Sequence, residues 1–273
     1  MRNIPEHVKW LVDTKERLTT ADGKTVEVWE FCHQPDDTIL SAWAKHYRNH
    51  YCSDGAIEDN RHLKSPADYL REDIFPDEKV KPGPSTRAGD FGEILTSDFF
   101  EYLFGYWVPR VRYKDRLKRN MPTQGSDVMG FMFASEKESS KDAVIVTEVK
   151  AQLTGNTFDL KLQEAVDHSI KDQIRKGESF NWIKRRTLSE ASPAEKDTFK
   201  LRFERFQSPV DRPYRDISGA VAIISNNIYD PAIATTANTA AHPNKDNLTL
   251  VIIRGETMMD LVGELYRRAA DEA

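Results

Sequence analysis

Apolar residues alternate, or recur at helical spacing, in a way that divides the chain into a short first part and a longer second part. In the first part, apolar runs at 7–17 and 24–32 flank Thr20-Ala21-Asp22-Gly23, and this turn signal predicts a β-hairpin. From Thr38 to Tyr51, apolar residues recur at helical spacing, and the two aspartates before them can cap a helix. This pattern predicts a small α+β unit.

Proline, glycine and charged residues crowd the stretch 76–87, which is the strongest break in the chain. We predict a domain boundary there. Residues 1–85 would form an N-terminal α+β domain, which is a candidate region for docking a partner. Residues 86–273 would form the larger domain, and a chain of 273 residues is long enough to bury a substantial core.

The second part mixes helical and strand patterns. A helix from Ala88 to Phe104 is apolar on nearly all sides, which is typical of a helix packed on several faces. The patterns after it predict strands at 107–115, 127–133 and 142–150, helices at 157–176 and within 178–206, strands at 217–225 and 248–254, and a closing helix at 256–270. In the helix at 157–176, apolar residues recur every four positions, at Phe158, Leu162, Val166, Ile170 and Ile174. This order favours the α/β (α+β) class, with a mixed β-sheet flanked by helices on both faces.

The composition is that of a soluble globular protein, because 39% of the residues are hydrophobic and 30% are charged. No run approaches the roughly 18 apolar residues of a membrane span, and the first residues lack the apolar core of a signal peptide. Cys32 and Cys52 are too few for a disulfide framework, so we expect a reducing, cytoplasmic setting without a membrane.

The net charge of −5 is unusual for a protein that binds DNA strongly by itself. Either nucleic acid is not the substrate, or its binding is local and assisted.

An acidic residue and a Glu-x-Lys triplet lie on the two arms of the hairpin predicted at 127–150. The midpoint between Asp127 and Glu148 falls inside the polar turn, so the two carboxylates should lie opposite one another. Strand alternation then places Glu148 and Lys150 on one face. Two carboxylates and an ammonium can hold Mg²⁺ and activate water for phosphodiester hydrolysis. An ordinary cross-strand salt bridge is the competing interpretation.

Two further features can contribute to this site. Glu93 lies in the apolar helix, where a carboxylate is costly unless it is paired or bound to metal; alternatively, it reaches solvent or caps the helix. The backbone carbonyl of Val149 could add a metal ligand, and Gly125 would let the backbone approach a metal or phosphate closely.

Basic residues alternate along the stretch 110–119. On a strand they would form one cationic face suited to a phosphate backbone, with a charged, aggregation-blocking edge strand as the alternative. The residues predicted to bind DNA are Arg110, Arg112, Lys114, Arg116, Lys118 and Arg119.

Histidines on the first predicted helix raise a separate metal hypothesis. His46 and His50 lie four positions apart, Cys52 follows, and Cys32-His33 could supply another zinc ligand. Packed histidines without metal are the competing interpretation. The chain lacks a Gly-x-x-x-x-Gly-Lys-Ser/Thr loop, so we predict no nucleotide bound by this chain.

Together, Glu93, Asp127 and Glu148-x-Lys150 resemble the core of the PD-(D/E)xK nuclease superfamily, a restriction-endonuclease-like fold. No proline precedes Asp127, which departs from the name-giving motif. Three longer segments look like the HamA effector family of the Hachiman anti-phage system: Arg87-Ala-Gly-Asp-Phe-Gly-Glu93, Asn120-Met-Pro-Thr-Gln-Gly-Ser-Asp127 and Thr147-Glu-Val-Lys150. The segment Trp43-Ala-Lys-His-Tyr-Arg-Asn-His-Tyr-Cys52 is also similar to that family.

The resemblance implies a defence nuclease that works with HamB, a superfamily 2 helicase, and takes DNA as its substrate. It implies Mg²⁺, or Mn²⁺, at a site whose catalytic and metal-binding positions carry over to Glu93, Asp127, Glu148 and Lys150. Weaker candidates for the same site are Asn120, Gln124, Gln152 and Gln163. Two alternatives stay open: a catalytically inactive nuclease fold that binds DNA or regulates the helicase, and a restriction or repair endonuclease that acts alone.

Overall fold

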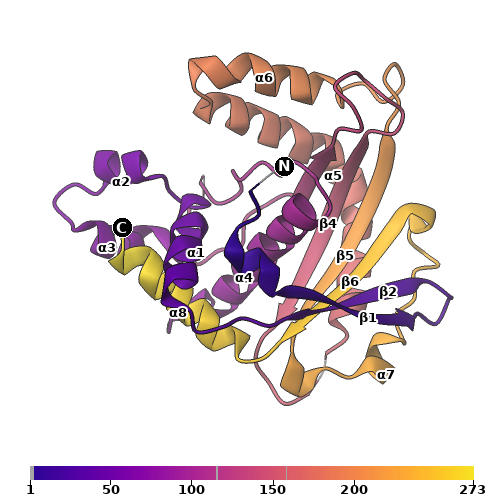
Figure 1. Ribbon diagram of the computed structural model, residues 1–273, viewed down its shortest axis with the longest axis horizontal. Coiled ribbons are helices and arrows are strands. Elements are labelled where there is room, and N and C mark those ends of the chain that lie inside the picture. Colours follow the sequence, from indigo (N-terminus) through magenta and orange to yellow (C-terminus); the bar gives the residue numbers. More distant parts are fainter. Residues whose placement is uncertain (1–2, 115, 158) are drawn as a thin grey trace.

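One six-stranded sheet, in the order β1-β2-β6-β5-β4-β3, runs through the computed structural model (Figure 1). The structure describes residues 3–114, 116–157 and 159–273. The strands are β1 (Leu11–Thr19), β2 (Thr25–Phe31), β3 (Val128–Met132), β4 (Ala143–Gln152), β5 (Arg215–Ser225) and β6 (Leu248–Gly255). The hairpins β1–β2 and β3–β4 are antiparallel and form the two edges, whereas β2, β6, β5 and β4 pair in parallel. The predicted mixed sheet is therefore confirmed.

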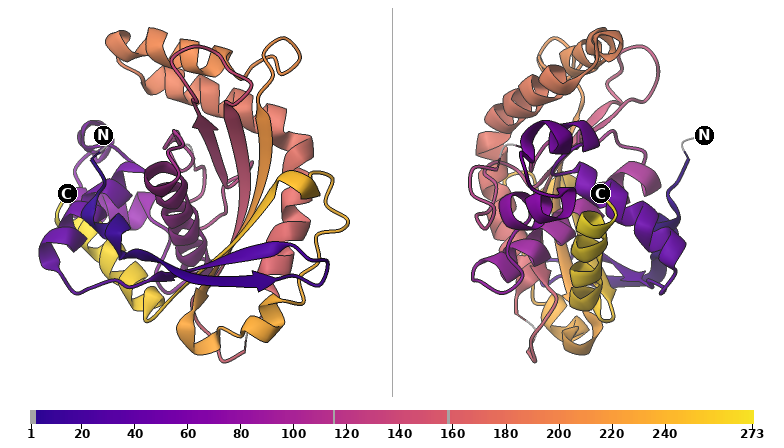
Figure 2. Two further views of the ribbon diagram at one scale, coloured as in Figure 1. Left: turned by 45° about the vertical axis from the view of Figure 1, so that its right-hand side comes forward. Right: turned by 90° about the vertical axis from the view of Figure 1, so that its left-hand side faces the viewer.

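Helices cover both faces of this sheet, as predicted. Figure 2 shows α4 on one face and the long α5 on the other. The α-helices are α1 (Asp37–Asn49), α2 (Asp54–Asn60), α3 (Pro66–Tyr69), α4 (Gly83–Asp98), α5 (Lys161–Glu190), α6 (Pro193–Glu204), α7 (Pro231–Ala234) and α8 (Met258–Asp271). Short helical turns are η1 (Glu6–Trp10), η2 (Leu70–Ile74), η3 (Phe99–Leu103), η4 (Asn226–Ile228) and η5 (Lys245–Asn247). None of the helices in the described ranges is long and apolar enough to cross a membrane.

Strand alternation explains how the central strands serve both layers. In β5, Val221 and Ile223 pack into the core that includes α1, α4 and α8, whereas Ala220 and Ala222 pack on the opposite side against α5. The alanines are small, so α5 can lie close to the sheet. A third apolar cluster lies where β3 and β4 meet the end of α5 and α6.

The N-terminal segment contributes to the same sheet and the same core as the rest of the chain. β2 pairs with β6, and Tyr47 of α1 packs edge-on against Tyr266 of α8 with ring centroids 5.1 Å apart. The sheet therefore extends across the predicted boundary between residues 85 and 86. Whether residues 1–85 fold as an independent domain stays a prediction.

The prediction of a strand at 107–115 is wrong. Only Trp107 forms a β-bridge, with Phe131, and the described residues from Val108 onward form turns and irregular structure. Pro109 has no backbone N–H to donate to a ladder. The alternating cations also favour this path, because they turn toward acids such as Asp90 and Asp98 instead of forming one exposed face. Asp115 lies outside the described residues.

The helix predicted at 157–176 begins later and is longer than expected, and only part of its predicted apolar stripe is buried, at Leu162 and Val166. α5 begins at Lys161 and extends to Glu190. Ile174, placed in the apolar stripe by its four-residue spacing, is 84% exposed. A repeat of four drifts around a helix of 3.6 residues per turn. The buried face therefore starts at Leu162 and Val166 but continues to Ser169 and Asp172. Phe158 lies outside the described residues.

Candidate active site

The β3–β4 hairpin brings Asp127 to the position opposite Glu148. Val128 pairs with Thr147 in the antiparallel ladder, so Asp127 and Glu148, each one residue further along the ladder, face each other. The backbone N–H of Val149 donates a hydrogen bond of 2.9 Å to Asp127 Oδ2 and fixes that side chain at the end of the hairpin. The predicted cross-strand placement is confirmed.

Glu148 and Lys150 lie on the same side of β4, as strand alternation predicted. The Lys150 ammonium donates a hydrogen bond to Glu148 Oε1. His168 Nδ1, from α5, lies 3.4 Å from the same oxygen. Val149 points to the other side and is buried in the core. One carboxylate oxygen thus has an ammonium on one side and an imidazole on another.

Glu93 reaches the site because α4 lies directly on the sheet. A Cβ added at Gly92 would lie 3.3 Å from side-chain atoms of both Val149 and Ile223, so glycine is what permits this close approach. Glu93 Oε2 accepts hydrogen bonds of 2.6 Å from Arg112 Nε and 2.6 Å from the Tyr113 hydroxyl. The carboxylate is paired, so the interpretation that Glu93 simply reaches solvent is wrong.

Arg112 lies between the two carboxylates. Besides Glu93, its guanidinium contacts Asp127 Oδ1, at 2.7 Å from Nη2. Its Nη1 also donates to the backbone oxygen of Ser126 at 2.5 Å and to that of Gly125 at 3.2 Å. Arg112 therefore organises the loop that leads into β3, and Gly125 adopts a left-handed φ of +90° there.

Asp172 is a further carboxylate of the site, from the buried face of α5. Asp172 is only 4% exposed, and its Oδ2 atom has no hydrogen-bond partner among the described residues. Burial and the nearby carboxylates of Glu148 and Asp127 raise the pKa of Asp172 to about 7. An unpartnered buried oxygen beside two further acids is the kind of atom that a cation would satisfy.

The same environment acts on the two motif carboxylates nearest Arg112. Burial raises the pKa of Asp127 to about 6; Arg112 opposes this rise and Glu148 adds to it. Burial also raises the pKa of Glu93, again against the effect of Arg112. Burial is the main cause of both shifts, so a cation bound beside these carboxylates would favour their ionised forms.

All of these side chains line one open cleft of about 1480 Å³. Glu93, Asp127, Glu148, Lys150 and Asp172 share it, and Val149 also lines it. Their carboxylate oxygens do not converge at metal-binding separations, since the only described trio of ligand atoms within 4.8 Å of one another lies elsewhere, at His7, His46 and Asp98. Arg112 occupies the space between Glu93 and Asp127.

The residues predicted to bind DNA are mostly engaged with acids of this chain. Arg110 contacts Asp98 and Glu101, Arg112 contacts Glu93 and Asp127, Lys114 contacts Glu190, Arg116 contacts Asp90, and Arg119 contacts Asp77. Lys118 is exposed and lines the cleft. On the opposite wall, Lys171 and Arg175 of α5 are exposed and line the same cleft.

Only one of the weaker candidates lines the cleft. Gln124 does, through the loop that Arg112 holds. Asn120 accepts a hydrogen bond from the backbone N–H of Asp77, 2.7 Å away. Gln152 binds the backbone of its own following loop, and Gln163 binds the backbone of Asn238. These three side chains brace loops in the structure.

Sequence reasoning missed Asp172, His168 and the position of Arg112. The signal for Asp172 was the 3.6-residue period of α5, which places it near Ala165 and Ser169 on the buried face. His168 lies one turn before Asp172. Nothing in the local pattern distinguishes Arg112 from its basic neighbours.

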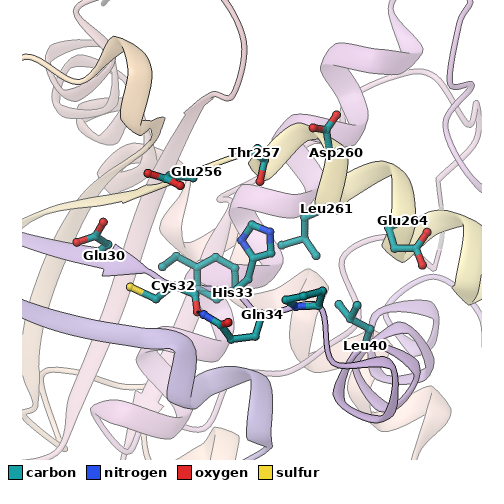
Figure 3. A pocket seen from close by; sticks show the side chains of 12 residues that line it. Glu30, Cys32, His33, Gln34, Leu40, Glu256, Thr257, Asp260, Leu261 and Glu264 are labelled. Atoms are coloured by element: carbon teal, nitrogen blue, oxygen red, sulfur yellow. Dashed lines mark hydrogen bonds between the residues drawn. The ribbon is translucent and has the colours of Figure 1, made fainter.

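A second pocket, of about 670 Å³, lies between the end of β2 and the start of α8 (Figure 3). Cys32 and His33 line it, together with acids that include Glu256 and Asp260. Cys32 and His33 were predicted as partners of His46 in a zinc site. The described structure groups His46 with His7 and Asp98 instead, so that ligand set is wrong.

No match was found among curated proteins. A sequence model of the HamA family, in contrast, matches residues 6–269 of this 273-residue chain. The match covers the hairpin, α4, the cleft and all but the end of α8, and the chain therefore belongs to the HamA family of Hachiman defence-associated proteins.

Proposed function

We propose that this chain is a metal-dependent deoxyribonuclease with a PD-(D/E)xK-like core, which hydrolyses DNA without sequence specificity as an effector of antiviral defence in the cytoplasm. One observation carries the proposal: Asp127 faces Glu148 across the hairpin, Lys150 lies beside Glu148, and all three line one cleft with Glu93. Family membership supports the defence role.

The chemical type of the donor atoms suits Mg²⁺ or Mn²⁺, and the carboxylates would have to draw together around the ion. Glu93, Asp127 and Glu148 offer carboxylate oxygens, which these hard cations prefer, and the unpartnered Oδ2 of Asp172 is a fourth source. The carbonyl of Val149 remains a proposed additional ligand. A bound cation would offset charge on the scissile phosphate and lower the pKa of a water molecule that it holds.

The protein's own groups have separate roles in this proposal. Lys150, held by Glu148, would place a positive charge beside the phosphate and orient the attacking water. Lys118, Lys171 and Arg175 on the cleft walls would contact the DNA backbone.

We further propose that a helicase partner of the HamB type delivers DNA to this cleft. The net charge of −5 disfavours strong DNA binding by the chain alone. Ion pairs with acids of the chain also occupy most of the basic stretch at 110–119. A partner that handles ATP and engages the DNA would compensate for both.

The position of Arg112 favours a second candidate, a nuclease fold without chemistry that binds DNA or regulates the helicase. Its guanidinium already compensates charge between Glu93 and Asp127, where a catalytic cation would act. The two functions differ in one simple measurement, because an inactive subunit would produce no Mg²⁺- or Mn²⁺-dependent nicking of plasmid DNA.

Plasmid cleavage by the chain with its helicase partner, Mg²⁺ and ATP tests the first proposal. Glu148→Gln and Lys150→Met should each lower cleavage by at least about 100-fold, with unchanged circular dichroism and partner binding. Glu138→Gln and Lys141→Ala, exposed in the turn of the same hairpin, are matched controls that should cleave normally. Cleavage at the normal rate by both site variants would contradict the proposal.

A further inference from the structure

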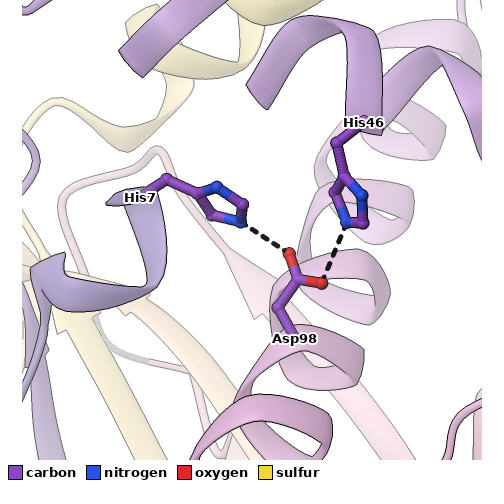
Figure 4. A group of neighbouring side chains, drawn as sticks. All are labelled: His7, His46 and Asp98. Atoms are coloured by element: carbon purple, nitrogen blue, oxygen red, sulfur yellow. Dashed lines mark hydrogen bonds and ion pairs between the residues drawn. The ribbon is translucent and has the colours of Figure 1, made fainter. Parts of the chain in front are cut away.

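A second group of ligand-type side chains lies apart from the cleft, where the N-terminal segment meets α4. Figure 4 shows His7 of η1, His46 of α1 and Asp98 at the end of α4 pointing toward one another. His7 Nε2 lies 3.0 Å from Asp98 Oδ2, and His46 Nε2 lies 3.1 Å from Asp98 Oδ1. A ligand atom from each residue lies within 4.8 Å of the other two.

We propose that His7, His46 and Asp98 form a structural site for a borderline divalent metal ion, with zinc as the expected occupant. Zinc–nitrogen bonds of about 2.0–2.1 Å place the ligand atoms of a tetrahedral site about 3.3 Å apart. His7 Nε2 lies 3.0 Å from Oδ2 of Asp98 and His46 Nε2 lies 3.1 Å from Oδ1, both close to that value, so each nitrogen can share a cation with one carboxylate oxygen.

His50 brings a third imidazole to this cluster. Its Nε2 lies 3.4 Å from His46 Nε2, which also lies 3.1 Å from Asp98 Oδ1. In the metal-free chain, His46 Nε2–H can donate to Asp98, with the lone pair of a neutral His50 beside it. Without that proton, His46 Nε2 can bind a cation together with the carboxylate.

The surroundings hold these ligands in place. The His7 ring stacks on Trp43 with centroids 4.5 Å apart and an interplanar angle of 8°. Asp98 is fully buried, and Arg110 Nη2 lies 2.9 Å from its Oδ1 while also contacting Glu101. Arg110 would orient the carboxylate from outside the metal, as hydrogen-bonding neighbours of metal ligands commonly do.

The ligand types select the metal. Two imidazoles and one carboxylate suit zinc and other borderline divalent ions, whereas Mg²⁺ prefers oxygen ligands. The side chain of His46 is 27% exposed, so water can reach a fourth position, and His50 lies beside it. The site would therefore be chemically distinct from the carboxylate cleft.

The site would join three segments that are far apart in the sequence, at residues 7, 46 and 98. Asp98 lies on the same helix as Glu93, five positions later. A metal here would fix the N-terminal segment to α4 and so hold α4 in position. The inference is independent of the proposed nuclease activity, since it concerns a different ligand set.

Metal analysis of the full-length chain tests the proposal. After dialysis with zinc and removal of loosely bound metal, the wild-type protein should retain about one zinc per chain, and Co²⁺ in its place should give the visible d–d absorption of a low-coordinate nitrogen–oxygen site. His46→Ala and Asp98→Asn should lose the metal. His62→Ala, at an exposed histidine, is the matched control and should retain it.

Two results would overturn the proposal. The first is a wild-type chain that binds neither zinc nor Co²⁺ stoichiometrically, a measurement that does not depend on any variant folding. The second is a zinc content that falls in Glu148→Gln, because the metal would then lie in the cleft. If Glu148→Gln loses cleavage but keeps zinc, the result supports both proposals. If the wild-type protein keeps zinc but does not cleave DNA, the result contradicts only the proposed nuclease activity.

Discussion

The Arg112 guanidinium lies 2.7 Å from Asp127 Oδ1 and makes Arg112 an internal partner of the predicted catalytic carboxylate. The same side chain binds Glu93 at 2.6 Å, so one cation joins α4 to the start of β3. The side chains of Arg112 and Glu93 are each 14% exposed, which means that this ion pair is largely shielded from solvent. A pair of this kind is costly to break from one side.

Arg112→Met should lower the free energy of unfolding by about 3 kcal/mol in metal-free buffer, because two largely buried carboxylates lose their cation. Mg²⁺ or Mn²⁺ should raise the melting temperature of this variant more than that of the wild type, since the cation can replace the lost charge. Urea denaturation with and without the metal measures both effects.

Arg267→Met provides the control for this prediction. Arg267 pairs with Glu264 on α8, but its side chain is 53% exposed, so the loss should stay below about 1 kcal/mol. If Arg112→Met is as stable as Arg267→Met, the guanidinium does not carry the compensating role that its contacts indicate.

How much of the site could be predicted from the sequence depends on how far apart in the chain the contacting residues lie. The opposition of Asp127 and Glu148 follows from a short turn and a two-residue strand period, so the local sequence determines it. The pairing of Arg112 with Glu93 requires the chain at 107–121 to fold over α4, and no local pattern encodes that path. The same holds for His7, whose partners lie 39 and 91 positions away. Long-range partners of charged residues were therefore missed, although most helices and strands were predicted close to their bounds.

The pKa of Asp172 predicts a pH dependence of stability. An aspartate in an unfolded chain has a pKa of about 3.9, whereas Asp172 in the folded protein has a pKa of about 7. The folded state therefore binds this proton more tightly. Its contribution to stability is complete below about pH 4 and is lost as the pH rises to about 7. Asp127 acts in the same direction, with its pKa of about 6.

Asp172→Asn should remove part of that dependence. Between pH 5 and pH 8 the free energy of unfolding of the wild type should fall, and that of the variant should fall by about 1–2 kcal/mol less. Urea titrations in metal-free buffer at several pH values provide the measurement. Asp59→Asn, at an exposed aspartate of α2, should follow the wild-type curve. A wild-type stability that does not change over this range would contradict the environment described for Asp172.

The cleft walls predict which basic residues contact DNA. Lys171 and Arg175 are exposed on α5 and line the cleft. Arg116 also lines it, but its guanidinium is held by Asp90. The double variant Lys171→Ala/Arg175→Ala should weaken DNA binding by the chain in complex with the proposed helicase partner. It should also reduce the slope of log affinity against log salt by about 2, one for each lost phosphate contact.

Lys196→Ala, on the exposed surface of α6, serves as the control for this measurement and should leave the slope unchanged. Fluorescence anisotropy over a range of salt concentrations gives the slopes. Equal slopes for the double variant and the wild type would show that phosphate contacts come from elsewhere on the complex.

Because α4 lies close to β4, a glycine-to-alanine substitution should change the free energy of unfolding in opposite directions at Gly92 of α4 and Gly177 of α5. Alanine favours a helix over glycine by about 1 kcal/mol. At Gly177 of α5 a new Cβ meets nothing within 4 Å, so Gly177→Ala should raise the free energy of unfolding by up to that amount. At Gly92 the new Cβ would lie 3.3 Å from Val149 and Ala151, and such overpacking costs about 1–3 kcal/mol.

Gly92→Ala should therefore be destabilised by about 1 kcal/mol net, and the shift of α4 that relieves the contact should move Glu93 away from the hairpin. A displacement of that kind affects a reaction more than it affects folding, so we expect cleavage to fall by about 10-fold or more. Urea denaturation and plasmid cleavage, run together on both glycine variants, measure the two effects. If Gly92→Ala gains stability as Gly177→Ala does and cleaves normally, contact between α4 and β4 is not what positions Glu93.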